Sequence, residues 1–345
     1  MKYMINRQNL INTAKGYSVN AQVYYPFKAN TNRHVVEILD PLIAGYEVAS
    51  IYHLIYLITK FKIEPQRILY SAPIKLNSQI KKALSLGVKN FVIDNIDELE
   101  RIICVVGNYH LNIILRVDIS NFINAQQSVF KWGASIKEIL HMKEILTKSG
   151  YHYMGLSFYI PQEADSVNNF IAVIDGIVNT IGLHDCKVID IGGGISSADV
   201  ELMLTRIKSK YELGEVRFIV EPGRHLLNPN IDLIVKIIDI REKQGQKLVF
   251  IDSGIYSGLM DSVIKNRRFK ISYIKKTKRQ LIEKVEQCLI CGDSSDISDV
   301  LGIYDLPKNI RVGDELRISE CGSYCSELNT DFCKNKRANY YVVDS

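Results

Sequence analysis

The chain has 345 residues, of which 47% are apolar and 23% are charged, and this suits one large or two ordinary globular domains. Its formal net charge of +5 is too small to indicate nucleic acid as a partner. No apolar run reaches the roughly 18 residues that span a membrane, and residues 1–7 become polar too early for a signal peptide. We therefore expect a cytoplasmic protein that binds neither nucleic acid nor a membrane.

Up to about residue 230, strand-like runs alternate with amphipathic helical stretches. Most runs are continuously apolar, which is typical of parallel strands covered on both faces. The eight runs are residues 23–29, 46–50, 67–71, 90–94, 112–119, 151–160, 186–192 and 216–223, and helical spacing is clearest in 79–84, 96–106, 137–148 and 167–181. The alternation predicts the α/β class, with a (β/α)8 TIM barrel over residues 7–230. No dinucleotide fingerprint of glycines follows the first strand, which disfavours a Rossmann domain.

After Arg224 the pattern changes to short strand-like runs separated by Gly, Asn and charged turns. These runs are residues 231–240, 247–252, 269–274, 315–318 and 338–343. No long helix is expected among them. We predict a second, mostly C-terminal all-β domain, made of residues 231–345 together with residues 1–6.

The seven cysteines are an odd number, so internal disulfides cannot use them all. Cys288 and Cys291, with Cys321, Cys325 and Cys333, resemble a zinc-ligand series. The two spacings differ, however, and no histidine follows Cys288. Reduced structural thiols without a metal are the favoured interpretation.

Basic residues cluster in a short segment, residues 265–284. The cluster consists of Lys265, Arg267, Arg268, Lys270, Lys275, Lys276, Lys278, Arg279 and Lys284. One interpretation is a solvated edge strand with its turn, and the other is an electropositive lip for an anionic substrate.

Lys28 follows the first strong strand-like run, where the chain turns polar. Catalytic groups of parallel α/β barrels gather where strands open into loops. The alternative is an exposed lysine that extends from a strand end into solvent. Lys28 is the candidate for a lysine that forms a Schiff base.

Two glycine-containing turns end the seventh and eighth runs. The first contains Gly193 and Gly194 within a triple glycine, and the second contains Glu221, Gly223 and Arg224. Glycine amides close around anions, arginine forks onto phosphate oxygens, and TIM barrels often bind phosphate after strands seven and eight. The alternatives are a tight turn that needs positive φ and an ordinary surface turn.

Taken together, these segments resemble the fold-type III pyridoxal-phosphate enzymes, in particular the ornithine, lysine, arginine and diaminopimelate decarboxylases. The matching segments occur in the family's order over nearly the whole chain. They are residues 25–30, 46–50, 72–75, 115–118, 131–134, 155–158, 192–194, 221–224, 252–256, 292–299, 312–314 and 320–324. The resemblance implies the barrel-plus-β-domain architecture of the alanine racemase and decarboxylase type, with pyridoxal 5'-phosphate as cofactor.

The resemblance also implies roles for individual residues. Lys28 would carry the cofactor as a Schiff base, and Glu221 would pair with the pyridine nitrogen, which favours decarboxylation over racemisation. Phosphate would be held by Gly193, Gly194, Gly223, Arg224 and Tyr324. Further cofactor contacts would come from Glu47, Arg116 and Tyr159. The family works as a homodimer with shared sites, to which each chain would lend Ser295 as catalytic group and Asp296 for substrate, and Asp252 is a second substrate candidate.

Three positions depart from the family's pattern. Tyr159 stands where a histidine usually stacks on the cofactor, and Ser295 stands where a cysteine usually donates a proton. Ser253 stands where the ornithine-type pattern has an acidic residue.

We predict a pyridoxal-phosphate-dependent decarboxylase that removes the α-carboxylate of an amino acid or of an amino-acid-bearing conjugate. A larger anionic conjugate, as in siderophore or peptide–nucleotide antibiotic pathways, is an alternative substrate, and racemisation is a third reading. A non-catalytic cofactor carrier or decarboxylase-regulating homologue is the alternative from another class.

Overall fold

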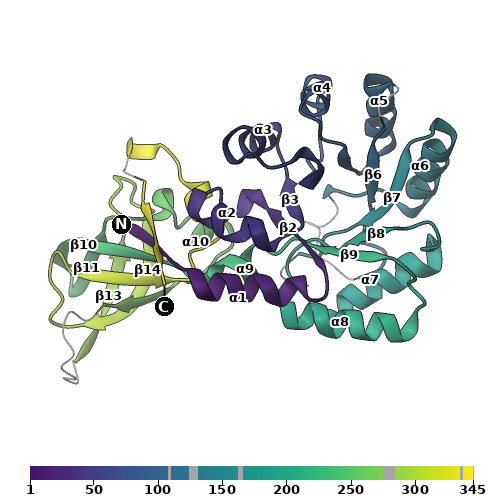
Figure 1. The fold of residues 1–345 in the computed structure, drawn as a ribbon. Coiled ribbons are helices and arrows are strands. Elements are labelled where there is room, and N and C mark those ends of the chain that lie inside the picture. The colour runs from purple at the N-terminus through teal and green to yellow at the C-terminus, as the bar shows by residue number, and fades with distance from the viewer. Residues whose placement is uncertain (108–109, 124–130, 162–165, 275–283, 335–336, 345) are drawn as a thin grey trace. The chain divides into compact units, whose positions relative to one another are not determined.

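The computed structural model describes residues 1–345 except 108–109, 124–130, 162–165, 275–283, 335–336 and 345 (Figure 1). The chain divides into two compact units, one made of residues 12–28 and 40–225 and the other of residues 1–11, 29–39 and 226–345. Residues 29–39 therefore group with the strand-rich unit, whereas the sequence prediction placed them in the barrel. No helix among the described residues has the length and apolarity needed to cross a membrane.

The first unit is built on a closed barrel of eight parallel strands, which confirms the predicted fold class. β9 pairs with β2 and closes the ring. The strands are β2 (Gln22–Pro26), β3 (Gly45–Val48), β4 (Ile68–Tyr70), β5 (Asn90–Ile93), β6 (Asn112–Arg116), β7 (His152–Ser157), β8 (Val188–Asp190) and β9 (Arg217–Val220). Each one overlaps a predicted strand-like run, and β2 and β3 begin one residue before theirs.

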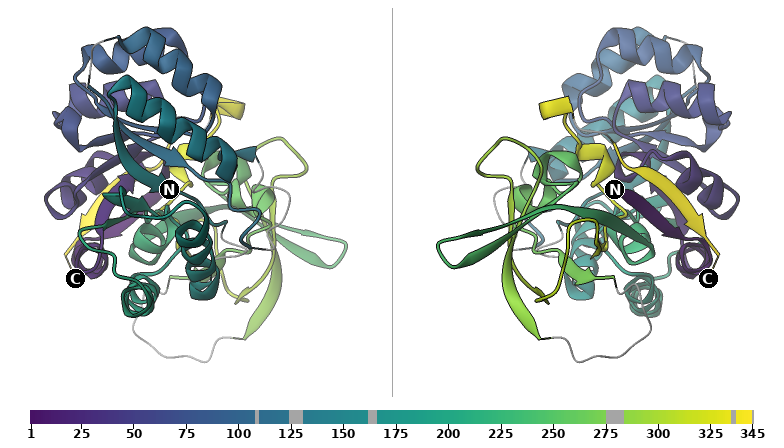
Figure 2. Two further views of the ribbon diagram at one scale, coloured as in Figure 1. Left: turned by 90° about the vertical axis from the view of Figure 1, so that its right-hand side faces the viewer. Right: turned by 90° about the vertical axis from the view of Figure 1, so that its left-hand side faces the viewer.

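Helices cover the outside of the barrel (Figure 2). They are α3 (Ile51–Tyr56), α4 (Asn77–Ser85), α5 (Ile96–Val106), α6 (Ile136–Ser149), α7 (Val167–Thr180) and α8 (Ser197–Lys210), preceded by α1 (Arg7–Ser18). Local sequence sets their ends: the Asn95 side chain accepts from Glu98 N at 2.8 Å, and Ser135 and Glu138 form a capping box. Gly150, at φ 74°, ends α6 in the left-handed region.

The interior of the barrel has an apolar layer beneath a polar one. Residues from five strands form the apolar cluster: Leu69, Val92, Ile114, Val188 and Ile219. Side chains alternate along a strand, so the residues two positions later face the same side. Those residues are Ser71, Asp94, Arg116, Asp190 and Glu221. Glu47 joins them, because it lies two positions after Gly45 on β3. Polar groups therefore gather at one mouth of the barrel, where the carboxyl ends of the strands lie.

The second unit contains an eight-stranded sheet with the order β12-β15-β10-β11-β13-β14, to which β1 and β16 are added beside β10. Its strands are β1 (Lys2–Asn6), β10 (Ile231–Lys243), β11 (Gln246–Ile251), β12 (Lys270–Tyr273), β13 (Val285–Cys291), β14 (Val300–Pro307), β15 (Glu315–Ser319) and β16 (Asn339–Val343). The helices α2 (Arg33–Leu39) and α10 (Asp261–Ile264) belong to the same unit, and the short α9 (Arg224–Leu227) lies at the boundary between the units.

β13 and β14 were not among the predicted strands. β13 carries Cys288 and Cys291, whose spacing suggested a metal site when only the sequence was considered. Both thiols are buried and free, and β13 pairs with β11 and β14. Among the described residues, no cluster of His, Cys, Asp or Glu is arranged to hold a metal ion.

Candidate active site

Lys28 lies in a 3-10 turn, Phe27–Ala29, directly after β2. Its Nζ donates to Glu47 Oε2 at 3.0 Å. The lysine side chain is 41% exposed and the glutamate 2%, so an accessible amine rests on a buried carboxylate. The hydroxyl of Ser71 donates to the other oxygen of Glu47 and fixes its position.

A second pair of carboxyl groups, Asp190 and Glu221, lies at the ends of β8 and β9. Asp190 is buried, accepts from the Gly192 amide at 2.9 Å and shares a hydrogen bond with Glu221. The Glu221 amide donates to Gly192 O at 2.7 Å, which joins the two strand ends. The sequence analysis gave no role to Asp190; its position two residues after Val188 on the inward side is the signal that identifies it.

Burial makes both acids hold protons more tightly than usual. It raises the pKa of Asp190 from 3.8 to about 6, with the Gly192 amide opposing the shift. Burial also raises the pKa of Glu221 well above its ordinary range, and the negative charges of Asp190 and Glu47 add to the effect, whereas Lys28 opposes it. Near neutral pH the pair therefore retains a proton, and a cationic group at this mouth would be attracted to it.

The loop after β8 is a glycine cradle. Gly192 and Gly194 have φ of 67° and 91°, which favours glycine. A Cβ on Gly193 would lie 2.5 Å from Glu221 O, so no side chain fits there. The loop runs into α8, a 14-residue helix whose N-cap Ser196 accepts from Asp199 N. Backbone amides before a helix N-terminus suit an anion such as phosphate.

The remaining predicted residues of the barrel unit lie at the same carboxyl ends. Arg116 ends β6, pairs in register with Ser157 and lowers the pKa of Asp190 through its positive charge. Tyr159 follows β7, is 41% exposed and lies against Gly192. Gly223 is buried, and Arg224 begins the short α9 three residues after Glu221.

Ser295 and Asp296 lie in the strand-rich unit, on the loop after β13. Tyr256 donates to Asp296 Oδ2 at 2.5 Å, and this bond lowers the pKa of Asp296. The exposed Ser295 hydroxyl lies 3.7 Å from the Cys333 thiol. The sequence analysis considered Cys333 only as a metal ligand, because residues 38 positions apart cannot be paired from spacing alone.

The same loop is anchored by Asp299, a buried carboxylate that accepts from Ile255 N at 2.7 Å and Ser294 N at 3.3 Å. A Cβ on Gly254 or Gly292 would lie within 2.4 Å of Asp299 oxygens. Both glycines are therefore required for the carboxylate to fit.

Two predicted residues serve the backbone of the strand-rich unit. Asp252 accepts from Lys236 N at 2.7 Å and from the Met1 amine at 2.5 Å. Tyr324, at φ 57°, donates its backbone N–H to Ala29 O at 2.8 Å. A role for Asp252 in substrate binding stays a prediction.

Three described members of the basic segment have partners within the same unit. Arg267 and Lys270 pair with Glu320 at 3.5 and 2.6 Å, and Arg268 donates to Ile303 O at 2.5 Å. Lys275, Lys276, Lys278 and Arg279 lie outside the described residues. The described members therefore match the solvated edge strand better than an anion-binding lip.

The raised pKa of Asp190 predicts a pH-dependent effect of its replacement. The folded protein holds this proton more tightly than the unfolded chain, so Asp190 favours folding below about pH 4 and loses that contribution as pH rises through about 6. A pKa difference of about two is worth about 2–3 kcal/mol. Asp190→Asn, which keeps an acceptor for Gly192 N, should raise the unfolding free energy of the apoprotein by this amount more at pH 8 than at pH 4, measured by urea denaturation.

The exposed Asp305 provides the control, since Asp305→Asn should have the same small effect at both pH values. Equal effects of Asp190→Asn at the two pH values would contradict the buried-acid interpretation.

Comparisons with known proteins identify the family of the chain. Residues 4–228 match the family model described as pyridoxal-dependent decarboxylase, pyridoxal binding domain. The chain is 26% identical to Decarboxylase flvG of Aspergillus flavus, over 90% of this chain and 77% of the relative. It is 24% identical to an ornithine decarboxylase of Schizosaccharomyces pombe, over 94% and 78%.

A solved structure, the arginine decarboxylase of Paramecium bursaria Chlorella virus, superposes with a TM-score of 0.87. The superposition covers 99% of this chain and 96% of that chain at 21% identity, and it supports the fold. The family match extends over more than half of the sequence and includes Lys28, the glycine cradle and Glu221. The chain belongs to the family of pyridoxal-dependent decarboxylases.

Proposed function

We propose that Lys28, Glu47, Asp190 and Glu221 form the centre at which this pyridoxal-phosphate-dependent decarboxylase removes the α-carboxylate of an amino acid. The observation that carries the proposal is the accessible Lys28 amine beside three inward carboxyl groups at one barrel mouth. A lysine, an acid that retains its proton and an anion cradle are the parts that pyridoxal phosphate requires.

The residues of the barrel unit fit the cofactor. The amides of Gly193 and Gly194, with Gly223 and Arg224, would hold the phosphate; Lys28 would carry the cofactor covalently; and Arg116 and Tyr159 would line its ring. A Cβ built on Gly193 would lie 2.5 Å from Glu221 O, so any side chain at this position would obstruct the cradle. A phosphate contact from Tyr324 stays a prediction of the family resemblance.

When bound, pyridoxal phosphate supplies an electron sink for the carbanion left by decarboxylation. The chain's own contribution begins with Glu47, whose buried carboxylate accepts a hydrogen bond from Lys28 Nζ and so positions the amine that would carry the cofactor. Because Ser71 holds the other Glu47 oxygen, the carboxylate stays in place when Lys28 moves away.

Glu221 supplies the second contribution, a proton at its carboxyl oxygen. Its raised pKa keeps that proton near neutral pH, and at this position the acid would hold a proton at the pyridine nitrogen of the bound cofactor. Asp190 would stabilise the Glu221 carboxyl group through the hydrogen bond between the two side chains. This arrangement makes the ring a stronger electron acceptor, which favours loss of carbon dioxide over racemisation.

The substrate is a free amino acid in this proposal. The basic residues that motivated a larger anionic conjugate are paired within the chain where they are described, at Glu320 and Ile303. The substrate screen below also tests whether the protein decarboxylates a larger conjugate.

A non-catalytic homologue is the second candidate function. It is favoured by two of the three departures, Tyr159 and Ser295, where an imidazole and a thiol usually stand. The Cys333 thiol, 3.7 Å from the Ser295 hydroxyl, argues against it, because a thiol, the usual kind of proton donor, lies beside Ser295.

Homodimerisation is part of the proposal. Ile297 is 91% exposed beside Ser295 and Asp296, and Phe332 is 44% exposed against Tyr256. Apolar side chains in this position suit a surface that a second copy covers. Each chain would lend Ser295, Asp296 and Cys333 to the centre of the other. We further propose a cytoplasmic location.

Carbon dioxide release tests the function. A screen with L-ornithine and L-arginine, the substrates in the names of two relatives, and then other amino acids and conjugates, should give release from at least one compound. Glu221→Gln keeps the shape but removes the proton and charge, so the cofactor should still bind while release falls at least ~100-fold, about 3 kcal/mol.

Glu215→Gln, an exposed residue on the loop before β9, is the matched control and should keep full activity. Release from no compound in the screen while the cofactor is bound favours the non-catalytic homologue. Unchanged turnover in Glu221→Gln would refute the proposed role of that acid.

The shared site is tested by complementation. Lys28→Ala lacks the amine of its own barrel, and Asp296→Ala lacks the carboxylate lent to the partner. If subunits exchange freely, about half of the dimers are mixed and each has one intact centre of two, so about a quarter of wild-type activity should return on mixing. Zero activity after demonstrated exchange would mean that Asp296 acts, if at all, within its own chain.

A further inference from the structure

The barrel unit contains a cavity on the opposite side of the apolar layer from Lys28. It has a volume of about 150 Å³. The first residues of four strands line it, namely Gln22 of β2, Asn90 of β5, Asn112 of β6 and Arg217 of β9. Each of them stands two positions before a residue that belongs to the apolar layer or packs against it, so all four face the inside of the barrel at its amino end. We call this space the amino-end cavity.

The inner wall of the amino-end cavity is apolar. It consists of side chains of the apolar layer together with Met154, which packs against that layer; the members are Leu69, Ile114, Met154, Val188 and Ile219. An apolar cavity of this volume can hold a molecule of the size of benzene. The inner wall therefore favours an apolar group over water.

The asparagines at the opening of the amino-end cavity are bonded within the chain. Asn112 Nδ2 donates to Asn90 Oδ1 at 2.8 Å, and Asn90 Nδ2 donates to Gln66 O at 2.9 Å. Because these amide donors have protein partners, they form a fixed side of the opening and do not by themselves call for a ligand.

Arg217 and Tyr24 are different, because neither the guanidinium nor the phenol hydroxyl has a hydrogen-bond or ion-pair partner within the described chain. Tyr24 also lines the cavity, and its ring lies over Gly45, where a Cβ would be 2.7 Å from the ring. Burial raises the pKa of Tyr24, and the positive charge of Arg217 is the largest effect that opposes the rise, so the guanidinium lies near the hydroxyl. The protonated phenol is a donor.

No acid balances these two donors at the cavity. All the residues that line it are described, and none of them is Asp or Glu. The opening thus combines a permanent positive charge and a hydroxyl donor with an apolar inner wall. This combination suits an anion that carries an apolar body.

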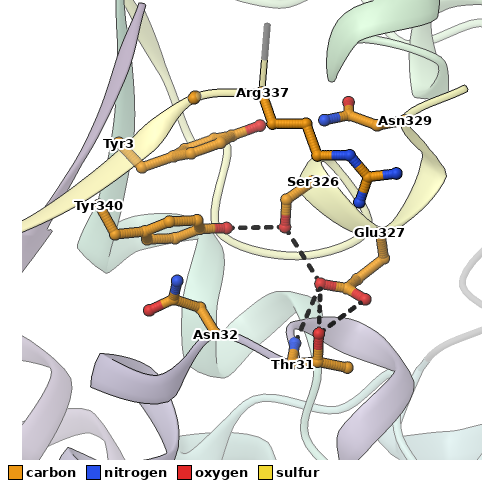
Figure 3. A pocket seen from close by; sticks show the side chains of 9 residues that line it. Tyr3, Thr31, Asn32, Ser326, Glu327, Asn329, Arg337 and Tyr340 are labelled. Carbon is orange, nitrogen blue, oxygen red and sulfur yellow. Dashed lines mark hydrogen bonds between the residues drawn. The ribbon is translucent and has the colours of Figure 1, made fainter. Parts of the chain in front are cut away.

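The strand-rich unit has a cavity of a different kind. Its volume is about 290 Å³, and its charged groups have partners within the chain (Figure 3). Glu327 accepts from Thr31 N at 3.0 Å and from Ser326 Oγ at 3.2 Å, and Arg337 pairs with Asp331 at 3.6 Å. That cavity therefore gives no comparable signal for a ligand.

We propose that the amino-end cavity binds a small monocarboxylate with an apolar body of about six carbon atoms. The carboxylate would accept from the Arg217 guanidinium and from Tyr24 Oη, and the apolar body would lie against the inner wall. Arginine can bind a carboxylate through two parallel bonds. Because Arg217 is exposed to solvent, the ion pair is partly screened, and we expect a dissociation constant near about 1 mM.

This site is separate from the proposed decarboxylation centre, with which it shares no residue. A bound ligand would contact Val188 and Ile219, whose strands end in Asp190 and run on to Glu221. The ligand and the Lys28 centre would therefore lie on opposite sides of one apolar layer.

The test uses the full chain with its cofactor bound, and benzoate is the probe. Binding is measured by ligand-observed saturation-transfer NMR up to about 20 mM. The matched compounds are benzyl alcohol, which lacks the charge, and acetate, which lacks the apolar body. Benzoate should bind saturably and each matched compound at least about five-fold more weakly, because each loses one of the two kinds of contact. The measurement is of binding and not of carbon dioxide release, so its result does not depend on the proposed function.

Arg217→Gln should weaken benzoate binding at least about five-fold, and Tyr24→Phe, which keeps the ring over Gly45, about three-fold. Arg206→Gln, which changes an exposed arginine of α8 outside the cavity, is the matched control and should leave binding unchanged. Absence of saturable binding would overturn the proposal and leave a cavity of ordered water only. Equal binding by Arg217→Gln and wild type would also overturn it, because benzoate would then bind elsewhere, as at the Lys28 centre.

Discussion

Alternation of side chains along the barrel strands is the constraint on which the rest of the active centre depends. Each inward apolar residue is followed two positions later by a polar one, as in Val188 and Asp190 or Ile219 and Glu221. The apolar layer excludes water from below, and the polar layer collects charge at the mouth. Because every strand runs parallel, all these strand ends meet at one place, and a shift of a single residue in any strand would turn its polar group away from the mouth.

Collecting carboxyl groups has an electrostatic consequence. Asp190 and Glu221 are desolvated and lie close to Glu47, so the barrel mouth carries more acid than one lysine balances, and the acids respond by retaining a proton. A site of this kind favours a cationic ring, because a positive charge offsets the repulsion among the carboxyl groups. The glycine cradle on the loop after β8 would bind the anionic end of such a molecule. Neighbouring stretches of the backbone therefore set the preference for a cation and the preference for an anion.

Much of this was predictable from the sequence, and the limits have physical reasons. The eight barrel strands were predicted correctly because buried parallel strands are continuous apolar runs that end in recognisable turns. The roles of Lys28 and the glycine turns stay predictions. Asp190 was missed because its role depends on the inward register, which only the apolar layer reveals. The proximity of Ser295 to Cys333 and the bond from Tyr256 to Asp296 join residues 38 and 40 positions apart, and no local pattern encodes them. β13 and β14 were not predicted as strands, and their pairing with each other and with β11 is seen only in the structure.

Chemical location of the cofactor tests the central claim most directly. Borohydride reduction of the cofactor-loaded protein, followed by proteolysis and mass spectrometry, should place the pyridoxyl group on Lys28, whose amine is accessible beside Glu47. Lys75 is the informative internal comparison, because it is fully buried and paired with Glu98 at 3.4 Å. A pyridoxyl group on Lys75, or on any lysine other than Lys28, would contradict the account of the barrel mouth.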